Sequence, residues 1–210
     1  MSALSATQMH AACEALCAND ADLAKAYGVT GLPIWRHAEP VYATLARTIV
    51  YQQISTKAAA SIWARLLDWS DGRLNASNVL SASEEELRAC GLSGPKIRHL
   101  TSIAEAVQSG ALPLSELHTH SDAEARRRLV AVRGIGPWTA DIFLMGALGR
   151  MDAFPEADLG LMEALRILQG AEVRLSPRDF RTHAERWRPY RGMAAHLLWG
   201  YLNHLRDRRA

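Results

Sequence analysis

LVAVRGIGPWTA, residues 129–140, joins the end of an apolar helix to the start of a second helix through the turn Gly-Ile-Gly. Gly134 and Gly136 permit positive φ angles and let the backbone approach a ligand closely. A helix begins with amide groups that lack partners within it, and these amides, with the helix dipole behind them, suit a phosphate group. The stretch therefore predicts a helix, a tight turn and a helix, which either hold a phosphate without reading bases or serve as a structural connection.

Helical periodicity dominates the rest of the 210 residues, and segments that alternate apolar and polar residues are nearly absent. Apolar residues recur at helical spacing at positions 41, 45 and 49, at 97, 100, 104 and 107, and at 194, 198, 201 and 205. We therefore expect an all-α fold of about ten short helices.

Capping residues and glycines mark the expected ends of these helices. Ser83 and Ser121 each stand three residues before a glutamate, which is the spacing of a capping box, and Ser176-Pro177 is typical of a helix start. Glycines that stop a helical pattern indicate helix ends at Gly28, Gly91, Gly110 and Gly170.

The chain length favours one compact unit, 1–210, made of two helical lobes around a cleft. A break in the helical pattern around 119–122 separates the predicted lobes. One lobe would combine 1–37 and the C-terminal helices with 38–120, and the other would hold the hairpin within 121–175.

Composition sets further expectations. No apolar run approaches the ~18–20 residues of a membrane helix, and the N-terminal residues lack a basic start before an apolar block, so we expect a cytoplasmic protein without membrane contact. Three cysteines predict reduced thiols. The net charge is +2, yet the residues from Ser176 onward carry eight arginines against three acids. These arginines lie either on solvated helix faces or against phosphates.

Four motifs in one order resemble the helix-hairpin-helix (HhH-GPD) DNA glycosylase superfamily, and within it the 3-methyladenine DNA glycosylase II branch. They are the hairpin itself, the loop with an aspartate in FPEADLGL at 154–161, YQQIS at 51–55 and WRPYR at 187–191. The resemblance covers roughly residues 38 to 205. It implies a two-lobed helical fold in which the hairpin is followed by a Gly/Pro-rich loop and an aspartate.

The resemblance also implies a function in base excision repair. The protein would be a monomeric, monofunctional glycosylase that binds damaged double-stranded DNA, near the nucleoid in a bacterium. It would hydrolyse the N-glycosidic bond of flipped alkylated purines, namely 3-methyladenine, 7-methylguanine and ethenoadenine.

Asp158 is the catalytic aspartate that the resemblance implies. A fixed carboxylate beside the sugar would stabilise the positive charge that develops as the base leaves. The same residue also stands where an aspartate caps a helix, and the two roles are compatible. Trp138 occupies the position of the lysine that forms a Schiff base in bifunctional members, so strand cleavage through an amine is not expected.

The remaining site residues follow from the same resemblance. Trp138 and Trp199, with Ile142 one turn beyond Trp138, are candidates for an aromatic pocket that attracts cationic bases. Gln53, with Gln52 beside it, would fill the hole left by the flipped base. Gly134, Gly136 and Thr139 would bind a DNA phosphate.

No cofactor is expected for the reaction. The three cysteines all precede residue 91, so the four-cysteine iron–sulfur cluster of some relatives cannot form near the C-terminus. The resemblance places a structural Na⁺ or K⁺ ion at the hairpin, bound by the main-chain carbonyls of Val130, Val132 and Gly134.

Two other functions fit the same sequence. A non-catalytic helix-hairpin-helix protein would use the turn for DNA binding and would not need Asp158. A glycosylase for oxidised or mismatched bases would share the site and differ in its substrates.

Overall fold

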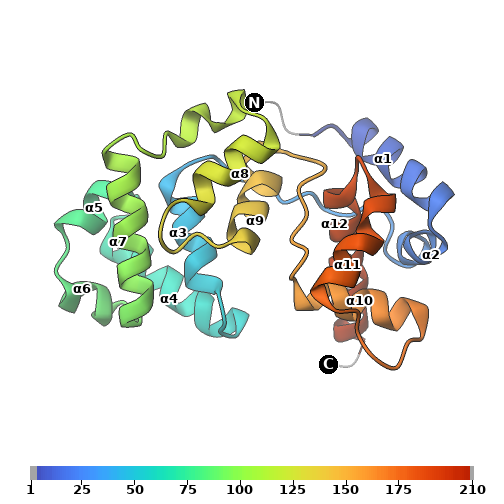
Figure 1. Ribbon diagram of the computed structural model, residues 1–210. Helices are drawn as coiled ribbons and strands as arrows, with labels where there is room; N and C mark the ends of the chain where they lie inside the picture. Colours follow the sequence, from blue (N-terminus) through green and yellow to red (C-terminus); the bar gives the residue numbers. More distant parts are fainter. Residues whose placement is uncertain (1–3, 209–210) are drawn as a thin grey trace. The chain divides into compact units, whose positions relative to one another are not determined.

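The computed structural model describes residues 4–208, and within them it contains α-helices, two short 3₁₀ helices and no strand (Figure 1). The predicted all-α fold is confirmed. The α-helices are α1 Ala6–Asn19, α2 Ala21–Thr30, α3 Tyr42–Tyr51, α4 Thr56–Trp69, α5 Ala76–Ser81, α6 Glu84–Ala89, α7 Gly94–Gln108, α8 Asp122–Val130, α9 Pro137–Leu148, α10 Leu159–Gln169, α11 Pro177–Ala184 and α12 Arg191–Asp207. The 3₁₀ helices are η1 Leu114–Thr119 and η2 Glu185–Trp187.

Two compact units make up the described chain. The central unit spans 38–148, and the terminal unit combines 4–37 with 149–208. These units differ from the predicted lobes, because the hairpin joins 38–120 and the N-terminal helices join only the C-terminal ones. The reason lies in α9, which follows the hairpin and packs against both α3 and α8.

The core of the central unit forms around α9. Eight of its twelve residues are buried, among them Phe143, Leu144 and Met145. A helix that is apolar on all sides must be enclosed by other elements. The neighbouring helix α3 packs on α4, α7 and α9, and its buried residues Leu45 and Ile49 follow the predicted helical spacing.

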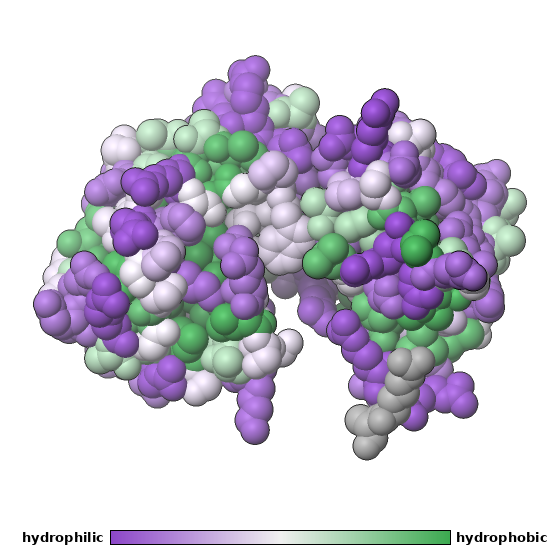
Figure 2. Space-filling model, turned by 60° about the horizontal axis from the view of Figure 1, so that its bottom comes forward, coloured by the Kyte–Doolittle hydropathy of each residue, from purple (hydrophilic) through white to green (hydrophobic). Residues whose placement is uncertain are grey.

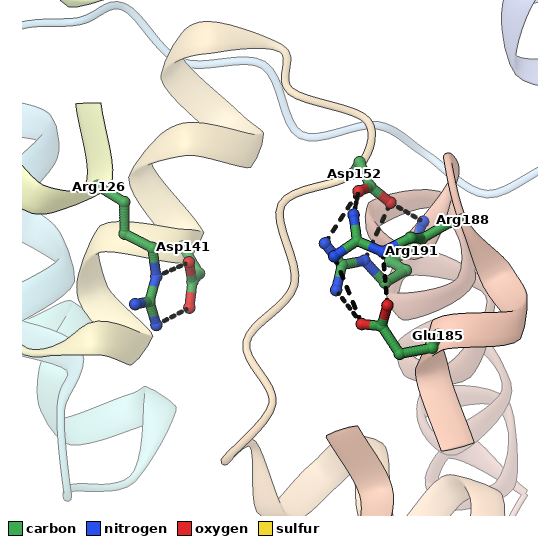
Figure 3. A network of polar contacts seen from close by, with 6 residues as sticks. All are labelled: Arg126, Asp141, Asp152, Glu185, Arg188 and Arg191. Carbon is green, nitrogen blue, oxygen red and sulfur yellow. Dashed lines mark hydrogen bonds and ion pairs between the residues drawn. The ribbon is translucent and has the colours of Figure 1, made fainter. Parts of the chain in front are cut away.

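An ion pair joins the two helices of the hairpin. The guanidinium of Arg126 in α8 donates to both carboxylate oxygens of Asp141 in α9, with Nε–Oδ1 at 2.8 Å and Nη2–Oδ2 at 3.2 Å (Figure 3). Asp141 is only 3% exposed. Loss of either partner would leave a charged group poorly compensated, so the pair fixes how α8 and α9 meet.

The hairpin turn sits directly on α7. Gly134 has a φ of +99°, and a Cβ atom added there would lie 2.6 Å from the Cβ of His99. Gly136 has no positive φ, contrary to expectation, and a Cβ atom there would meet nothing within 4 Å. Only the first glycine of the turn is therefore required by its φ angle and by the packing of the turn on His99.

In the terminal unit, α12 packs against α2 and α10. Asp20 caps α2 by accepting the amides of Asp22 and Leu23, and its second oxygen accepts the indole N–H of the buried Trp187 at 2.7 Å. The Asp20 carboxylate thus caps the start of α2 and also provides an acceptor for the buried indole N–H of Trp187, which is distant in the sequence.

Charged residues fasten the loop that leads from 149 to 158 onto the start of α12. Asp152 accepts from the side chains of Arg188 and Arg191, and Glu185 binds the same two arginines (Figure 3). The amide of Gly192 donates to the Met151 carbonyl at 2.7 Å. A Cβ atom at position 192 would lie 2.8 Å from that oxygen, so glycine allows this close approach.

Most predicted helix ends are confirmed. Ser83 forms a full capping box with Glu86, and both Ser121 and Ser176 cap their helices. Gly170 ends α10 in the left-handed conformation, and Gly91 and Gly110 follow helix ends with positive φ. Gly28 is the exception, since it lies inside α2 and the helix ends at Gly31.

None of the helices within 4–208 combines the length and the apolar character that a membrane span requires. Hydrophilic residues cover much of the face drawn in Figure 2, with hydrophobic residues between them.

Several C-terminal arginines form ion pairs with acidic residues, including Arg181 with Glu156 and Arg188 with Glu185. The arginine-rich C-terminal region is therefore less basic than its count of arginines suggests.

We predict that Gly134→Ala destabilises the protein by about 2 kcal/mol or more, because alanine would combine a left-handed φ with a contact to the Cβ of His99 that no rotamer change relieves. The control is Gly136→Ala, which we expect to change the free energy of unfolding by less than about 0.5 kcal/mol. Urea denaturation measures both. Equal effects would contradict this account of the turn.

Candidate active site

The carboxylate of Asp158 is held at the start of α10. Its Oδ1 accepts the amide of Leu161 at 2.9 Å and the indole N–H of Trp199 at 3.3 Å. The first bond is a helix cap, as one interpretation of the sequence expects. Asp158 is only half-buried, and the next residue, Leu159, is 64% exposed. The carboxylate is thus fixed in orientation and still close to the protein surface.

Asp158 and Asp20 form a matched pair within the terminal unit. Each caps a helix and each accepts an indole N–H, from Trp199 and Trp187 respectively. Asp20 is 7% exposed and therefore serves only the interior. The two residues differ in exposure and in the oxygens that they use. Asp20 accepts on both carboxylate oxygens, whereas both of these bonds to Asp158 fall on Oδ1.

The space around Asp158 is tight on the side of α10. A Cβ atom at Gly160 would lie 3.1 Å from Asp158 Oδ1 and 3.9 Å from Cδ1 of Trp199. A side chain at 160 would therefore press on the carboxylate, whereas its distance to the indole would be an ordinary van der Waals contact. Glycine at this position lets both groups keep their contact.

Trp199 belongs to an aromatic cluster of three side chains, Trp35, His196 and Trp199. The rings of Trp35 and His196 stack with centroids 4.2 Å apart and an interplanar angle of 17°. His196 meets Trp199 edge to face, at 5.5 Å and 77°. The imidazole therefore supports the tryptophan that holds the candidate catalytic carboxylate.

His196 is a neutral ring at ordinary pH. Burial lowers its pKa from 6.5 to about 4, against an opposing effect of the Gly192 carbonyl that lies 2.8 Å from its Nδ1 atom. Arg36 lowers the pKa slightly further. The aromatic cluster thus carries no charge of its own beside Asp158.

The predicted wedge lies in the central unit, in the turn between α3 and α4. We call residues 52–55 the wedge turn. Gln53 is exposed and has a φ of +57°, which is uncommon for any residue other than glycine. Gln52 is half-buried, and its side-chain amide donates to the Thr139 hydroxyl at 2.7 Å. Of the two glutamines, Gln53 has the exposed side chain, whereas the side chain of Gln52 is bound within the protein.

The side chain of Thr139 points into the protein. It is 1% exposed, and its hydroxyl accepts the bond from Gln52. Its side chain is therefore a link between α9 and the wedge turn, and it does not offer a phosphate contact in this structure. Sequence reasoning missed this because the partner lies 87 positions away.

The other predicted residues keep accessible positions. Trp138 and Ile142 are half-buried one turn apart on α9, in the central unit. Trp199 lies in the terminal unit. Gly134 and Gly136 lie in the turn before α9, and Gly136 is exposed.

The carbonyl groups at the hairpin suit an alkali ion in their chemistry. Val130 is the last residue of α8, where helix carbonyls lack partners within the helix. The carbonyl of Val132 accepts the Ile135 amide at 3.1 Å and keeps a second lone pair. Within 4–208, no group of three or more His, Cys, Asp or Glu side chains is placed to hold a metal.

Three residues of the site carried no signal in the sequence. In the sequence, His196 and Trp35 are ordinary members of helical or loop segments, and Lys96 follows the glycine-containing turn GLSGP at 91–95, which suits either a DNA contact or packing. Lys96 in fact donates to the carbonyls of Val50 and Gln52, at 2.6 and 3.0 Å. The one sequence signal for these bonds is the position of Lys96, which is the third residue of a helix that begins with Gly94 and Pro95.

Comparisons with known proteins give matches over most of the chain. The family model for "HhH-GPD superfamily base excision DNA repair protein" matches residues 46–189. The DNA-3-methyladenine glycosylase 1 of Schizosaccharomyces pombe is 35% identical over 161 residues, which are 75% of this chain and 71% of that protein.

Solved structures of similar proteins cover most of the chain. A 3-methyladenine DNA glycosylase of S. pombe in complex with abasic DNA superposes with a TM-score of 0.84 at 32% identity, over 90% of this chain and 95% of that one. A DNA-3-methyladenine glycosidase from Bacillus halodurans gives a TM-score of 0.79 at 30% identity, over 93% and 91% of the two chains.

We predict that His196 makes stability depend on pH. The unfolded chain binds a proton near pH 6.5 and the folded protein only near 4, so stability falls as the pH drops through this window, by up to about 1.4 kcal/mol per pH unit. His196→Phe keeps a ring in the cluster and removes the titrating group, so it should flatten this part of the profile. Unfolding in urea between pH 4 and 8 measures the slopes. An unchanged slope in the variant would disprove the assignment.

Proposed function

Because this chain belongs to the HhH-GPD superfamily of base excision DNA repair proteins, on its 3-methyladenine DNA glycosylase branch, we propose that it is a monofunctional DNA glycosylase for alkylated purines. It would hydrolyse the N-glycosidic bond of a purine flipped out of double-stranded DNA, acting as a monomer without a required cofactor. The observation that carries the proposal is the half-buried carboxylate of Asp158, fixed by Leu161 and Trp199.

Asp158 supplies the electrostatic part of the proposed reaction. As the bond to the base breaks, the sugar gains oxocarbenium character, and a carboxylate fixed in advance stabilises this charge without reorganising. Both bonds to Oδ1 restrict the side chain to one orientation. The carboxylate would also orient the water that attacks the sugar carbon.

An aromatic pocket would recognise the damaged base. Methylated purines such as 3-methyladenine and 7-methylguanine carry positive charge, which the face of an indole attracts. Trp138 and Trp199 are the proposed walls, with Ile142 as an apolar contact. Such bases also leave easily, so a permissive pocket would suffice for 3-methyladenine and 7-methylguanine. The same permissive pocket would also admit ethenoadenine, which is neutral.

The hairpin would bind the DNA backbone. The amides at the start of α9 suit a phosphate, and a Cβ atom at Gly136 would meet nothing in the protein, so the space beside this glycine is open to a ligand. A Na⁺ or K⁺ ion held by the carbonyls of Val130, Val132 and Gly134 would add positive charge there. Gln53 would occupy the space that the flipped base leaves.

We predict that the protein releases 3-methyladenine and 7-methylguanine from methylated DNA, and that Asp158→Asn lowers single-turnover release about 100-fold or more. Asparagine is also a good helix cap, so the free energy of unfolding should change by less than about 0.5 kcal/mol, and DNA binding should persist. Mass spectrometry of released bases measures the activity.

The matched control for this experiment is Asp20→Asn, which alters the same kind of cap and indole contact in the buried position. We expect it to lower stability and to leave base release per folded molecule unchanged. No release by the unaltered protein would favour a non-catalytic DNA-binding protein. Release of 8-oxoguanine or mismatched bases in place of methylated purines would favour the other class of glycosylase.

We predict that no covalent protein–DNA adduct forms when the protein acts on damaged duplex in the presence of borohydride. Trp138 cannot form a Schiff base, and none of the three lysines of the chain, Lys25, Lys57 and Lys96, lies in the hairpin. Lys96 is bound by the carbonyls of Val50 and Gln52. Gel electrophoresis under denaturing conditions detects the adduct. A trapped adduct would contradict the monofunctional assignment.

A further inference from the structure

Lys96 joins the start of α7 to the end of α3. It is the third residue of α7, and it is half-buried. Its ammonium group donates to the carbonyls of Val50 and Gln52, at 2.6 and 3.0 Å. These carbonyls belong to the last turn of α3 and to the residue immediately before Gln53.

The position is unfavourable for a lysine in two respects. A positive charge in the first turn of a helix is repelled by that helix's own dipole, and burial lowers the pKa of Lys96 because it disfavours the charged form. The compensation comes from α3. The carbonyls at the end of a helix attract a cation, and here two of them, Val50 and Gln52, receive bonds from it.

The backbone that follows is strained. Gln53 has a φ of +57°, and a left-handed conformation at a residue with a side chain persists only where the surroundings enforce it. Gln52 is held by Lys96 through its carbonyl and by Thr139 through its side chain. On the other side, the hydroxyl of Ser55 caps α4 by accepting the Ala58 amide. The wedge turn is thus fastened at both ends while Gln53 stays exposed.

We propose that Lys96 is a positioning residue for base flipping, which holds Gln53 in its left-handed conformation so that its side chain is ready to enter the duplex. This inference rests on the proposed function, in which Gln53 is the wedge. Lys96 would therefore act on DNA through Gln53 and would itself touch neither the base nor the sugar.

The test is a double-mutant cycle of Lys96→Met and Gln53→Ala. The readouts are single-turnover release of 7-methylguanine and the fluorescence of 2-aminopurine placed opposite an abasic analogue, which rises when the wedge disturbs stacking. We expect Lys96→Met to lower the release rate and the fluorescence change about tenfold in the wild-type background, as the loss of a charged hydrogen bond at the turn implies. In the Gln53→Ala background it should lower them by less than about twofold, because coupled residues are non-additive.

Lys25→Met is the matched control. Lys25 also donates to a carbonyl near the end of a helix, that of Leu168 at 3.4 Å, but it belongs to the terminal unit, whereas the wedge turn belongs to the central unit. We expect it to leave both readouts unchanged. If Lys96→Met unfolds the protein, Lys96→Gln takes its place in the cycle. The shorter glutamine amide loses at least one of the two bonds, and because it keeps a donor it should destabilise the protein less.

The proposal is overturned if the lysine substitution has the same effect with and without Gln53, or if it has none in the wild-type background. The 2-aminopurine duplex contains no damaged base, so the fluorescence measurement does not depend on base release. The fluorescence cycle therefore remains informative even for a protein without glycosylase activity. Absence of base release by the wild-type protein would thus refute the proposed function alone, whereas additive fluorescence effects would refute the role of Lys96.

Discussion

The burial of α9 is the constraint on which the rest of the structure depends. A helix with eight buried residues among twelve needs neighbours on nearly every side, and α3 and α8 are among those that enclose it. Enclosure brings the hairpin, the wedge turn and the first turn of α7 into one unit. Asp141 is buried in this interior, and its charge needs a partner, which Arg126 of α8 supplies. The ion pair then fixes the angle at which α8 enters the hairpin.

Polar side chains at helix ends do most of the positioning in both units. Asp20 and Asp158 each satisfy amides at a helix start and an indole from a distant helix or turn, while Lys96 satisfies carbonyls at a helix end. Such groups must find partners when they are removed from water. In this protein the same requirement that completes a helix also orients the residues proposed to act on DNA.

The proposed chemistry needs only a few groups held in fixed directions. A carboxylate restrained by two donors, an indole supported by a neutral histidine, and a glutamine on a strained turn are each prepared before any substrate binds. Preparation of this kind reduces the cost of reorganisation during the reaction. On this proposal, His196 and Lys96 would contribute to the site through the groups that they hold.

The sequence by itself determined the features that depend on near neighbours. Helix periods, the caps at Ser83 and Ser176, the positive φ of Gly134 and the helix start at Asp158 all arise from contacts within a few residues, so a local pattern predicts them. Only the tertiary structure decided that Thr139 is buried against Gln52, that Trp199 binds Asp158, and that the hairpin joins 38–120. These contacts link residues tens of positions apart, and packing of whole helices, which no local pattern encodes, brings them together.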